Sequence, residues 1–331
     1  MVVSYNLMIA FLISMAVTVA AGFILIPVLR RIKAGQSIRE DGPVWHSAKQ
    51  GTPIMGGLMF ITGTIVACAI AGFDDLRNGD FRQAYVLAFA LVFGLIGFTD
   101  DYRKFRNQRN LGLTVRAKFG LQLLVSAAFI LIMHFNGSVS PQLYIPFFNV
   151  DINIPAPVYY AFAAFVMVGT VNSVNITDGV DGLAAGVSIP VCVFFACMAV
   201  LWGLTAMGAL AAALAGGLVA FLLFNFHPAR IFMGDTGALF IGGAVCGLAF
   251  AMDMPLILII VGIVYIVETA SDIVQVLYFK ITHGKRIFKM APLHHHFELC
   301  GWSEYKLFTV YTLVSALFAV LGFFGARNRY I

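Results

Sequence analysis

Apolar stretches long enough to cross a membrane follow one another along almost the whole chain. A spanning helix needs about 20 mostly apolar residues, and such stretches cover residues 6–29, 54–72, 84–99, 117–134, 157–172, 183–202, 204–224, 237–252, 256–279 and 307–325. Hydrophobic residues make up 60% of the 331 residues and charged residues only 11%, which is too little polar surface for a soluble globule. The sequence therefore predicts an all-α polytopic integral membrane protein of about ten transmembrane helices.

Two of these helix boundaries are breaks inside longer apolar runs. Residues 183–226 contain no charged residue and are too long for one crossing, so we expect a break near Trp202 and Gly203. We expect another break at 253–255, because Pro255 cannot continue a helix and the Asp253 carboxylate needs water.

The Lys and Arg residues predict the orientation. All 21 except Arg77, Arg82, Arg327 and Arg329 lie in or beside alternate loops, including Lys33, Arg39 and Arg109. Because cytoplasmic loops carry the excess of Lys and Arg, we expect these loops inside and both termini outside. The net charge of +5 follows from the same rule, so it does not call for a nucleic-acid partner.

We expect one transmembrane domain, residues 1–331, without a separate soluble domain. Its functional loops on the cytoplasmic side are 30–53, 101–116, 173–182, 225–236 and 280–306. On the other side, residues 143–154 mix β-prone side chains with Asn and Pro, which predicts a small external β-hairpin.

Five aspartates lie at the predicted cytoplasmic ends of apolar stretches. They are Asp100, Asp101, Asp178, Asp181 and Asp235. Carboxylate oxygens are the hard ligands that Mg²⁺ prefers, usually shared with water and substrate phosphates. Convergence of these loops would therefore build a magnesium and phosphate site, whereas a purely structural alternative makes each aspartate a helix cap or an interfacial charge.

Glycines favour the first interpretation for the central pair of aspartates. Gly179 follows Asp178 and Gly182 follows Asp181. Both glycines are able to adopt positive φ, which lets backbone amides turn toward an anion while the carboxylates hold a cation.

Two further groups of ionisable residues lie near the C-terminus. His294, His295 and His296 could bind phosphates, shuttle a proton or bind a metal, and nearby basic residues favour anion binding. Glu268 and Asp272, four residues apart on one helix face, are expected to form a polar network between helices rather than to act in catalysis.

Four blocks of the sequence resemble the signature blocks of a known enzyme family. They are DDYRK at 100–104, NSVNITDGVDGL at 172–183, NFHPARIFMGDTG at 225–237 and APLHHHFE at 291–298. Together they are similar to the polyprenyl-phosphate N-acetylhexosamine-1-phosphate transferases. The histidine block resembles the phospho-N-acetylmuramoyl-pentapeptide transferase branch of that superfamily, and the resemblance covers essentially the whole chain.

The resemblance implies a Mg²⁺-dependent reaction of peptidoglycan and cell-wall synthesis, and hence of cell shape and division. Phospho-MurNAc-pentapeptide moves from UDP-MurNAc-pentapeptide to undecaprenyl phosphate, giving UMP and undecaprenyl-diphospho-MurNAc-pentapeptide, lipid I. It also implies a multi-pass protein of the bacterial inner membrane with its active site on the cytoplasmic side, and a homodimer is a fair expectation.

The resemblance also assigns roles residue by residue. Asp235 is the magnesium ligand, Asp100 and Asp101 lie close to the reacting phosphates, and Asp178 is a further catalytic position. The histidine block is also assigned to catalysis. The substrate-binding positions are Asp181 near the uracil pocket, Lys49, Lys118, Asn172, Asn175, Asn225 and Phe232.

Two questions stay open at this level. Asp100 either deprotonates or orients the lipid phosphate, or an aspartate is a nucleophile that forms a phospho-enzyme. The alternatives in function are a UDP-N-acetylglucosamine:polyprenyl-phosphate transferase, which shares the aspartates, and a secondary transporter. A transporter predicts inverted repeats and binding groups near the midplane, and the sequence has neither.

Overall fold

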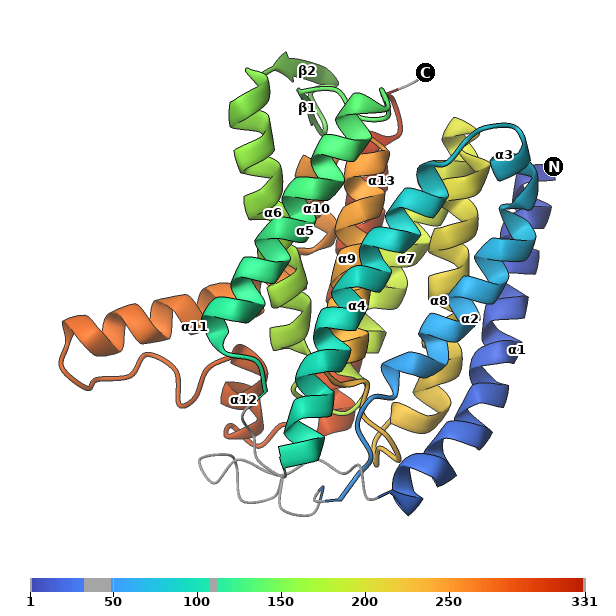
Figure 1. Cartoon of the computed structure of the whole chain (residues 1–331). Helices are drawn as coiled ribbons and strands as arrows, with labels where there is room; N and C mark the ends of the chain where they lie inside the picture. Colours follow the sequence, from blue (N-terminus) through green and yellow to red (C-terminus); the bar gives the residue numbers. More distant parts are fainter. Residues whose placement is uncertain (1, 33–48, 50, 108–111, 330–331) are drawn as a thin grey trace.

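The computed structural model describes residues 2–32, 49, 51–107 and 112–329 and is almost entirely helical (Figure 1). The first half contains α1 (Val2–Arg31), α2 (Gly57–Ala71), α3 (Phe73–Arg77), α4 (Arg82–Asn107), α5 (Val115–Phe135) and α6 (Ala156–Thr177). The second half contains α7 (Leu183–Trp202), α8 (Thr205–Asn225), α9 (Gly234–Ala251), η2 (Pro255–Ile257), α10 (Leu258–Val261), α11 (Ile263–Ile281), α12 (Leu293–Glu298) and α13 (Glu304–Ala326). The predicted all-α membrane fold is confirmed.

Within these ranges, eight helices are long and apolar enough to span a membrane, or nine if the bent pair η2–α10 and α11 is one span. The remaining predicted span corresponds to α2, which has 15 residues. All ten predicted stretches are thus largely helical, while the exact number of crossings stays a prediction. The breaks at Gly203, with φ of 69°, and before Pro255 lie where they were expected.

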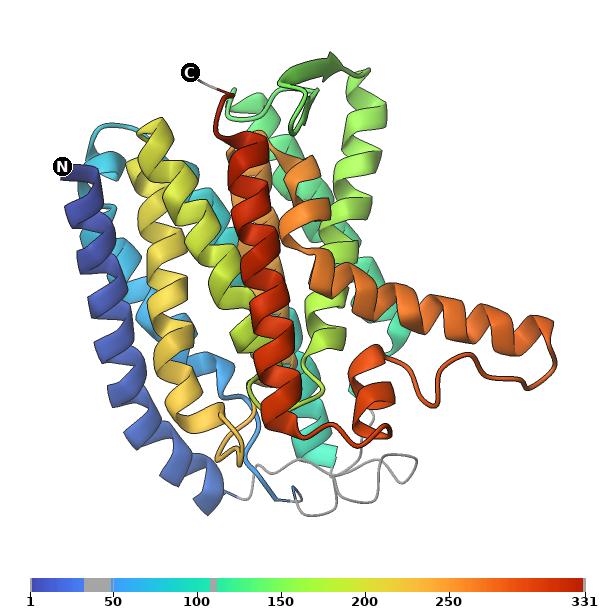
Figure 2. The ribbon, with the colours of Figure 1, turned by 180° about the vertical axis from the view of Figure 1, so that it is seen from behind.

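The ninth predicted span, 256–279, is not one straight helix. At Gly262 the chain turns by 80°, and α11 leaves the bundle sideways as a projecting arm (Figures 1 and 2). Most of its outer half is apolar and exposed, including Ile273, Val276 and Leu277. Composition predicts an apolar helix here, but it does not determine the direction that the helix takes.

Helix α9 is the centre of the bundle. Every residue from Thr236 to Ala251 is buried, and glycines let neighbouring backbones approach it directly. A Cβ atom on Gly57 of α2 would lie 2.3 Å from Gly237 Cα, and one on Gly97 of α4 would lie 2.1 Å from the Asp235 carbonyl oxygen. Small residues at such crossings are characteristic of helix packing in membranes.

The two ends of the bundle differ in structure. Both described chain ends lie at one end, together with the predicted hairpin, which is confirmed as β1 (Gln142–Ile145) paired antiparallel with β2 (Val150–Asn153). The hairpin is joined to the end of α13, because Phe147 N–H donates to the Gly325 carbonyl at 2.8 Å. The segments 173–182 and 225–236 lie at the opposite end, and α12 lies toward it beneath the α11 arm (Figure 2).

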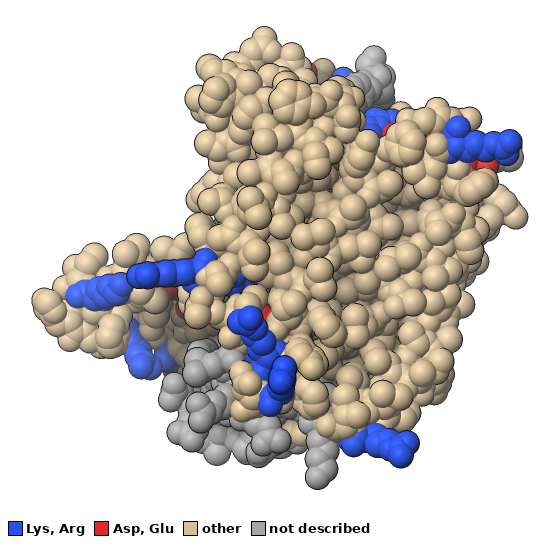
Figure 3. Space-filling model, in the orientation of Figure 1, with Lys and Arg blue, Asp and Glu red and all other residues tan. Residues whose placement is uncertain are grey.

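The charged side chains are also unevenly distributed over the surface. Figure 3 shows a bundle flank almost free of charged side chains, with Lys and Arg gathered toward the two ends and along the arm. Lys33, Arg39 and Arg109 lie outside the described residues. The location of both termini outside the cell stays a prediction, although their position at the same end of the bundle agrees with it.

We expect Gly216→Ala to destabilise the bundle by about 1–3 kcal/mol, as overpacking does. A Cβ atom there would lie 2.2 Å from the Phe11 carbonyl oxygen, so α1 and α8 would have to separate. The control is Gly169→Ala, because a Cβ atom at Gly169 meets nothing within 4 Å. Thermal unfolding in detergent measures both, and equal melting temperatures would contradict this view of the α1–α8 contact.

Candidate active site

Helices α4 and α9 meet through a carboxylate. α4 does not end at Asp100, as the sequence suggested, but continues to Asn107. Asp101 accepts hydrogen bonds from Asp235 N–H at 3.2 Å, Thr236 N–H at 2.9 Å and the Thr236 hydroxyl at 2.6 Å. An anion at a helix N-terminus satisfies otherwise unpaired N–H groups, so Asp101 fixes the first turn of α9.

Gly234 makes this contact feasible. Its φ is +68°, and a Cβ atom would lie 2.5 Å from Asp101 Oδ2. Both the backbone conformation and the space therefore require glycine directly before Asp235.

Asp235 lies among cations and an amide. Its Oδ2 is 2.7 Å from Lys118 Nζ and 3.1 Å from Lys104 Nζ, and its Oδ1 accepts from Asn175 Nδ2 at 2.9 Å. Lys104 also contacts Asp100 Oδ2 at 2.6 Å. These residues come from α4, α5, α6 and α9, so the convergence predicted for this part of the site is present.

Gly112 and Leu113, which precede α5, lie against Asp100. Leu113 N–H donates to Asp100 Oδ1 at 2.7 Å, and a Cβ atom on Gly112 would lie 2.4 Å from the same oxygen. One oxygen from each of Asp100, Asp101 and Asp235 lies within 4.8 Å of the others. We call these three residues the acidic cluster.

Asp178 adjoins the acidic cluster from the end of α6. It is the C-cap residue of α6, directly after Thr177. Burial, together with the charges of Asp235, Asp101 and Asp181, raises the pKa of its carboxyl group well above the ordinary value of 3.8. Asp178 is therefore the member of the site that most readily stays protonated.

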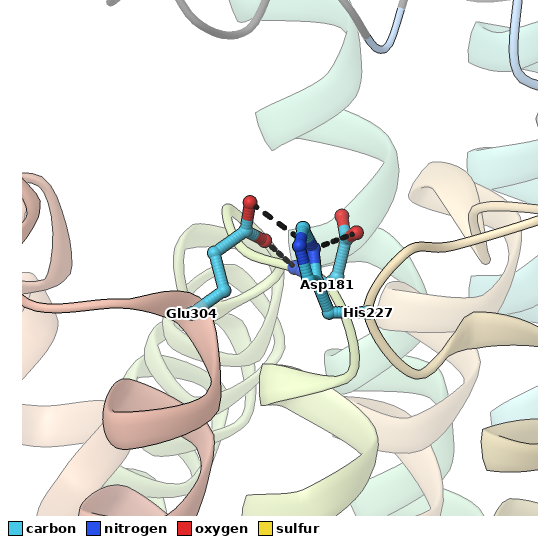
Figure 4. A group of neighbouring side chains, drawn as sticks. All are labelled: Asp181, His227 and Glu304. Carbon is cyan, nitrogen blue, oxygen red and sulfur yellow. Dashed lines mark hydrogen bonds and ion pairs between the residues drawn. The ribbon is translucent and has the colours of Figure 1, made fainter.

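A second cluster surrounds Asp181 (Figure 4). Lys49 Nζ lies 2.7 Å from both Asp181 Oδ1 and Glu304 Oε2, and His227 Nδ1 lies 2.9 Å from Asp181 Oδ2. Burial lowers the pKa of Lys49, but the two carboxylates outweigh it and the net shift is upward. Lys49 therefore stays protonated between the Asp181 and Glu304 carboxylates. We call these four residues the Lys49 cluster.

Sequence reasoning missed Lys104 beside the acidic cluster, and His227 and Glu304 of the Lys49 cluster. Lys104 lies four residues after Asp100 on one helix, a spacing that brings side chains together. His227 lies in the same block as Asn225, and Glu304 follows the Gly301-Trp302 pair. The first two carried a local signal, but only the folded chain brings α13 and Glu304 to Lys49.

Asn225, Asn172 and Phe232 form hydrogen bonds with residues outside the two clusters. Asn225 is buried and braces two loops, since its Oδ1 accepts from Gly182 N–H at 3.1 Å and its Nδ2 donates to Ile231 O at 2.9 Å. Asn172 donates to Gln122 Oε1 at 2.7 Å. Phe232 is partly buried, and its N–H donates to Pro53 O at 2.8 Å.

One of the two glycines able to adopt positive φ does so. Gly182 has φ of +74° and begins α7, but Gly179 does not adopt a left-handed conformation. The need for glycine at 179 therefore has another cause, which lies in the histidine block.

The three histidines of α12 differ in their contacts. His294 is buried, with Nδ1 2.7 Å from Glu268 Oε2. His295 Nδ1 lies 2.7 Å from Glu298 Oε2, and His296 Nδ1 accepts from the Lys289 N–H at 3.0 Å. The expected polar network at Glu268 is thus present, whereas Asp272 is only partly buried and lies on the arm.

Comparison with known proteins identifies the family. The model of glycosyl transferase family 4 matches residues 83–253, a range that includes all five aspartates. Phospho-N-acetylmuramoyl-pentapeptide-transferase of Caldanaerobacter subterraneus subsp. tengcongensis is 46% identical over 316 residues, covering 96% of this chain and 97% of that protein. The proteins of the same name from Acetivibrio thermocellus and Clostridium acetobutylicum are 46% and 42% identical, each over 97% of this chain, and are themselves covered to 95% and 98%. With this similarity along nearly its full length, the chain belongs to the phospho-N-acetylmuramoyl-pentapeptide transferase family.

Proposed function

We propose that the chain transfers phospho-MurNAc-pentapeptide from UDP-MurNAc-pentapeptide to undecaprenyl phosphate, with release of UMP and formation of lipid I. Family membership makes it a transferase with several membrane helices. One observation of the structure carries the proposal furthest. The segment 178–181 joins two groups of charged side chains. One is the acidic cluster, whose charge Lys104 and Lys118 partly balance, and the other is the Lys49 cluster, in which the Lys49 ammonium lies between two carboxylates.

This arrangement suits a nucleotide diphosphate that carries a sugar. We assign the acidic cluster to the diphosphate and the lipid phosphate. The Lys49 cluster is assigned to the nucleoside, because Lys49, Asp181 and His227 offer both donors and acceptors within a small space. Asn225 and Gly182 shape this second cluster through the backbone rather than by direct contact.

The donor set of the acidic cluster fits Mg²⁺. Three carboxylates converge, and hard oxygen ligands are those that Mg²⁺ prefers. We assign Asp235 as its main ligand, and Lys104 and Lys118 balance part of the carboxylate charge. When bound, Mg²⁺ neutralises phosphate charge and stabilises the UMP leaving group.

The residues of the chain supply positioning around the reacting phosphates. Both oxygens of Asp100 are engaged, one by Lys104 and the other by the Leu113 N–H. This supports a role for Asp100 in orienting the lipid phosphate over a role as nucleophile. A phosphate monoester has a second pKa near 6, so its attacking oxygen needs little help to lose a proton at neutral pH.

We place the reaction at the cytoplasmic side of the bacterial inner membrane. Both clusters lie at the end of the bundle opposite to the described chain ends, and UDP-linked substrates are made in the cytoplasm. We keep a homodimer as a proposal.

The direct test is UMP release by the purified protein in detergent. Release should require UDP-MurNAc-pentapeptide, undecaprenyl phosphate and Mg²⁺ together. UDP-N-acetylglucosamine serves as the parallel donor. Release from that donor alone would assign the protein to the sibling activity, and no release from either would overturn the proposal.

We expect Asp235→Asn to lower kcat by at least about 10²-fold without unfolding the protein, because it weakens the proposed metal site. The matched control is Asp80→Asn at the other end of the bundle, where the Asp80 side chain forms an ion pair with Arg82. EDTA should abolish wild-type turnover and Mg²⁺ should restore it. Equal activity of the two variants would exclude Asp235 from the site.

We expect Asp178→Asn to remove a pH-dependent loss of stability in the metal-free protein. Because the folded-state pKa of Asp178 is raised, its ionisation opposes folding. This penalty is absent below the ordinary value of 3.8 and grows as the pH rises toward the folded-state pKa. Melting temperatures in EDTA should therefore fall with rising pH more steeply for wild type than for the variant, and parallel profiles would refute this.

A further inference from the structure

His294 and Glu268 form a pair that is shut away from solvent. Their side chains are 1% and 0% exposed, and His294 Nδ1 lies 2.7 Å from Glu268 Oε2. The His294 N–H lies 3.5 Å from the same oxygen. Next to this pair, Leu293 N–H donates to Ser271 Oγ at 3.1 Å, so α12 is held against α11 by the pair and by the contact beside it.

The other ring nitrogen of His294 has no hydrogen-bond partner among the described residues. Nε2 is buried, and a buried polar atom without a partner is costly. It faces the Asp178–Asp181 segment, since a Cβ atom on Gly179 would lie 2.1 Å from it. Gly179 has no left-handed φ. The imidazole ring, rather than the backbone, therefore requires glycine at 179.

We propose that Glu268 is a positioning residue that fixes the tautomer and direction of His294, so that Nε2 accepts a hydrogen bond from an O–H group of a bound substrate beside Gly179. This deepens the proposed function and rests on it for the identity of the substrate. Glu268 acts only through His294, and Gly179 provides the space that the ring nitrogen needs.

The tautomer follows from the chemistry of the partner. A carboxylate only accepts hydrogen bonds, so Nδ1 carries a proton, and in the tautomer that this selects Nε2 presents its lone pair. The O–H group that it receives belongs either to a protonated phosphate or to the sugar of the donor. The two sources can be distinguished by measuring which substrate binds less tightly once the tautomer is lost.

A structural role for Glu268 makes different predictions. If the pair only tied α12 to α11, the effects of changing Glu268 and His294 would appear in stability and would not depend on tautomer. Tyr311 of α13 also interacts with the Glu268 carboxylate, so stability is measured for every variant.

The first experiment uses Glu268→Gln, which keeps the size of the side chain but permits either tautomer. We expect kcat to fall roughly 10²-fold with the melting temperature nearly unchanged. In a double-mutant cycle with His294→Asn, Glu268→Gln should cost nothing further, because the residue through which it acts is gone. The KM values for UDP-MurNAc-pentapeptide and undecaprenyl phosphate, measured separately, identify the substrate that donates. Additive losses in the cycle would overturn the proposal.

The second experiment does not depend on catalysis. Magic-angle-spinning NMR of the protein labelled with ¹⁵N-histidine reports the protonation of each ring nitrogen, and the His294 signals are those missing in His294→Asn. We expect protonated Nδ1 and unprotonated Nε2 in the wild type and a mixture of tautomers in Glu268→Gln. An unchanged tautomer in that variant would refute the proposal even if UMP release were never observed.

The third experiment tests the space around Nε2. Gly179→Ala should displace the ring, shift the His294 signals and lower kcat. Gly120→Ala is the control, because a Cβ atom at Gly120 meets nothing within 4 Å. Unchanged His294 signals and kcat in Gly179→Ala would show that Nε2 is not directed at this segment.

Discussion

The contact between Asp101 and the first turn of α9 determines where the rest of the site lies. It connects two helices that are far apart in sequence through three hydrogen bonds to one carboxylate. Asp235 is in that first turn, so its position relative to Asp100 and Lys104 follows from the same contact. Asn175 and Lys118 then approach Asp235 from α6 and α5. The site is thus organised around the end of a buried helix rather than around one loop.

The sequence predicted most of this architecture for identifiable physical reasons. Apolar length and the cost of unpaired backbone groups in lipid leave helices as the spanning structure. The uncharged run after Leu183 broke at Gly203, and the Asp253–Pro255 corner ended α9 as proline chemistry requires. The aspartates also came together, because Asp178, Asp181 and Asp235 lie at or next to helix ends and Asp100 and Asp101 lie in the last turns of α4.

What the sequence did not predict depends on contacts between distant segments. The 80° turn at Gly262 is a change of direction that apolar composition does not encode. Glu304 reaches Lys49 across 255 residues of chain. Gly179 seemed to be a turn glycine, but the ring of His294, far along the sequence, explains it. In each case the local pattern was compatible with several arrangements, and tertiary packing selected one.

The glycines of the bundle centre have a consequence for motion during turnover. Gly57 and Gly97 bring the backbones of α2 and α4 against α9 with no side chain between them, so these helices cannot slide past one another without steric collision. The carboxylates of α4 and α9 are therefore preorganised, and little reorganisation energy is needed when substrates bind. The α11 arm is not held in this way, because it projects from the bundle with most of its outer half exposed. The chain thus combines carboxylates fixed on tightly packed helices with an arm that the bundle does not enclose.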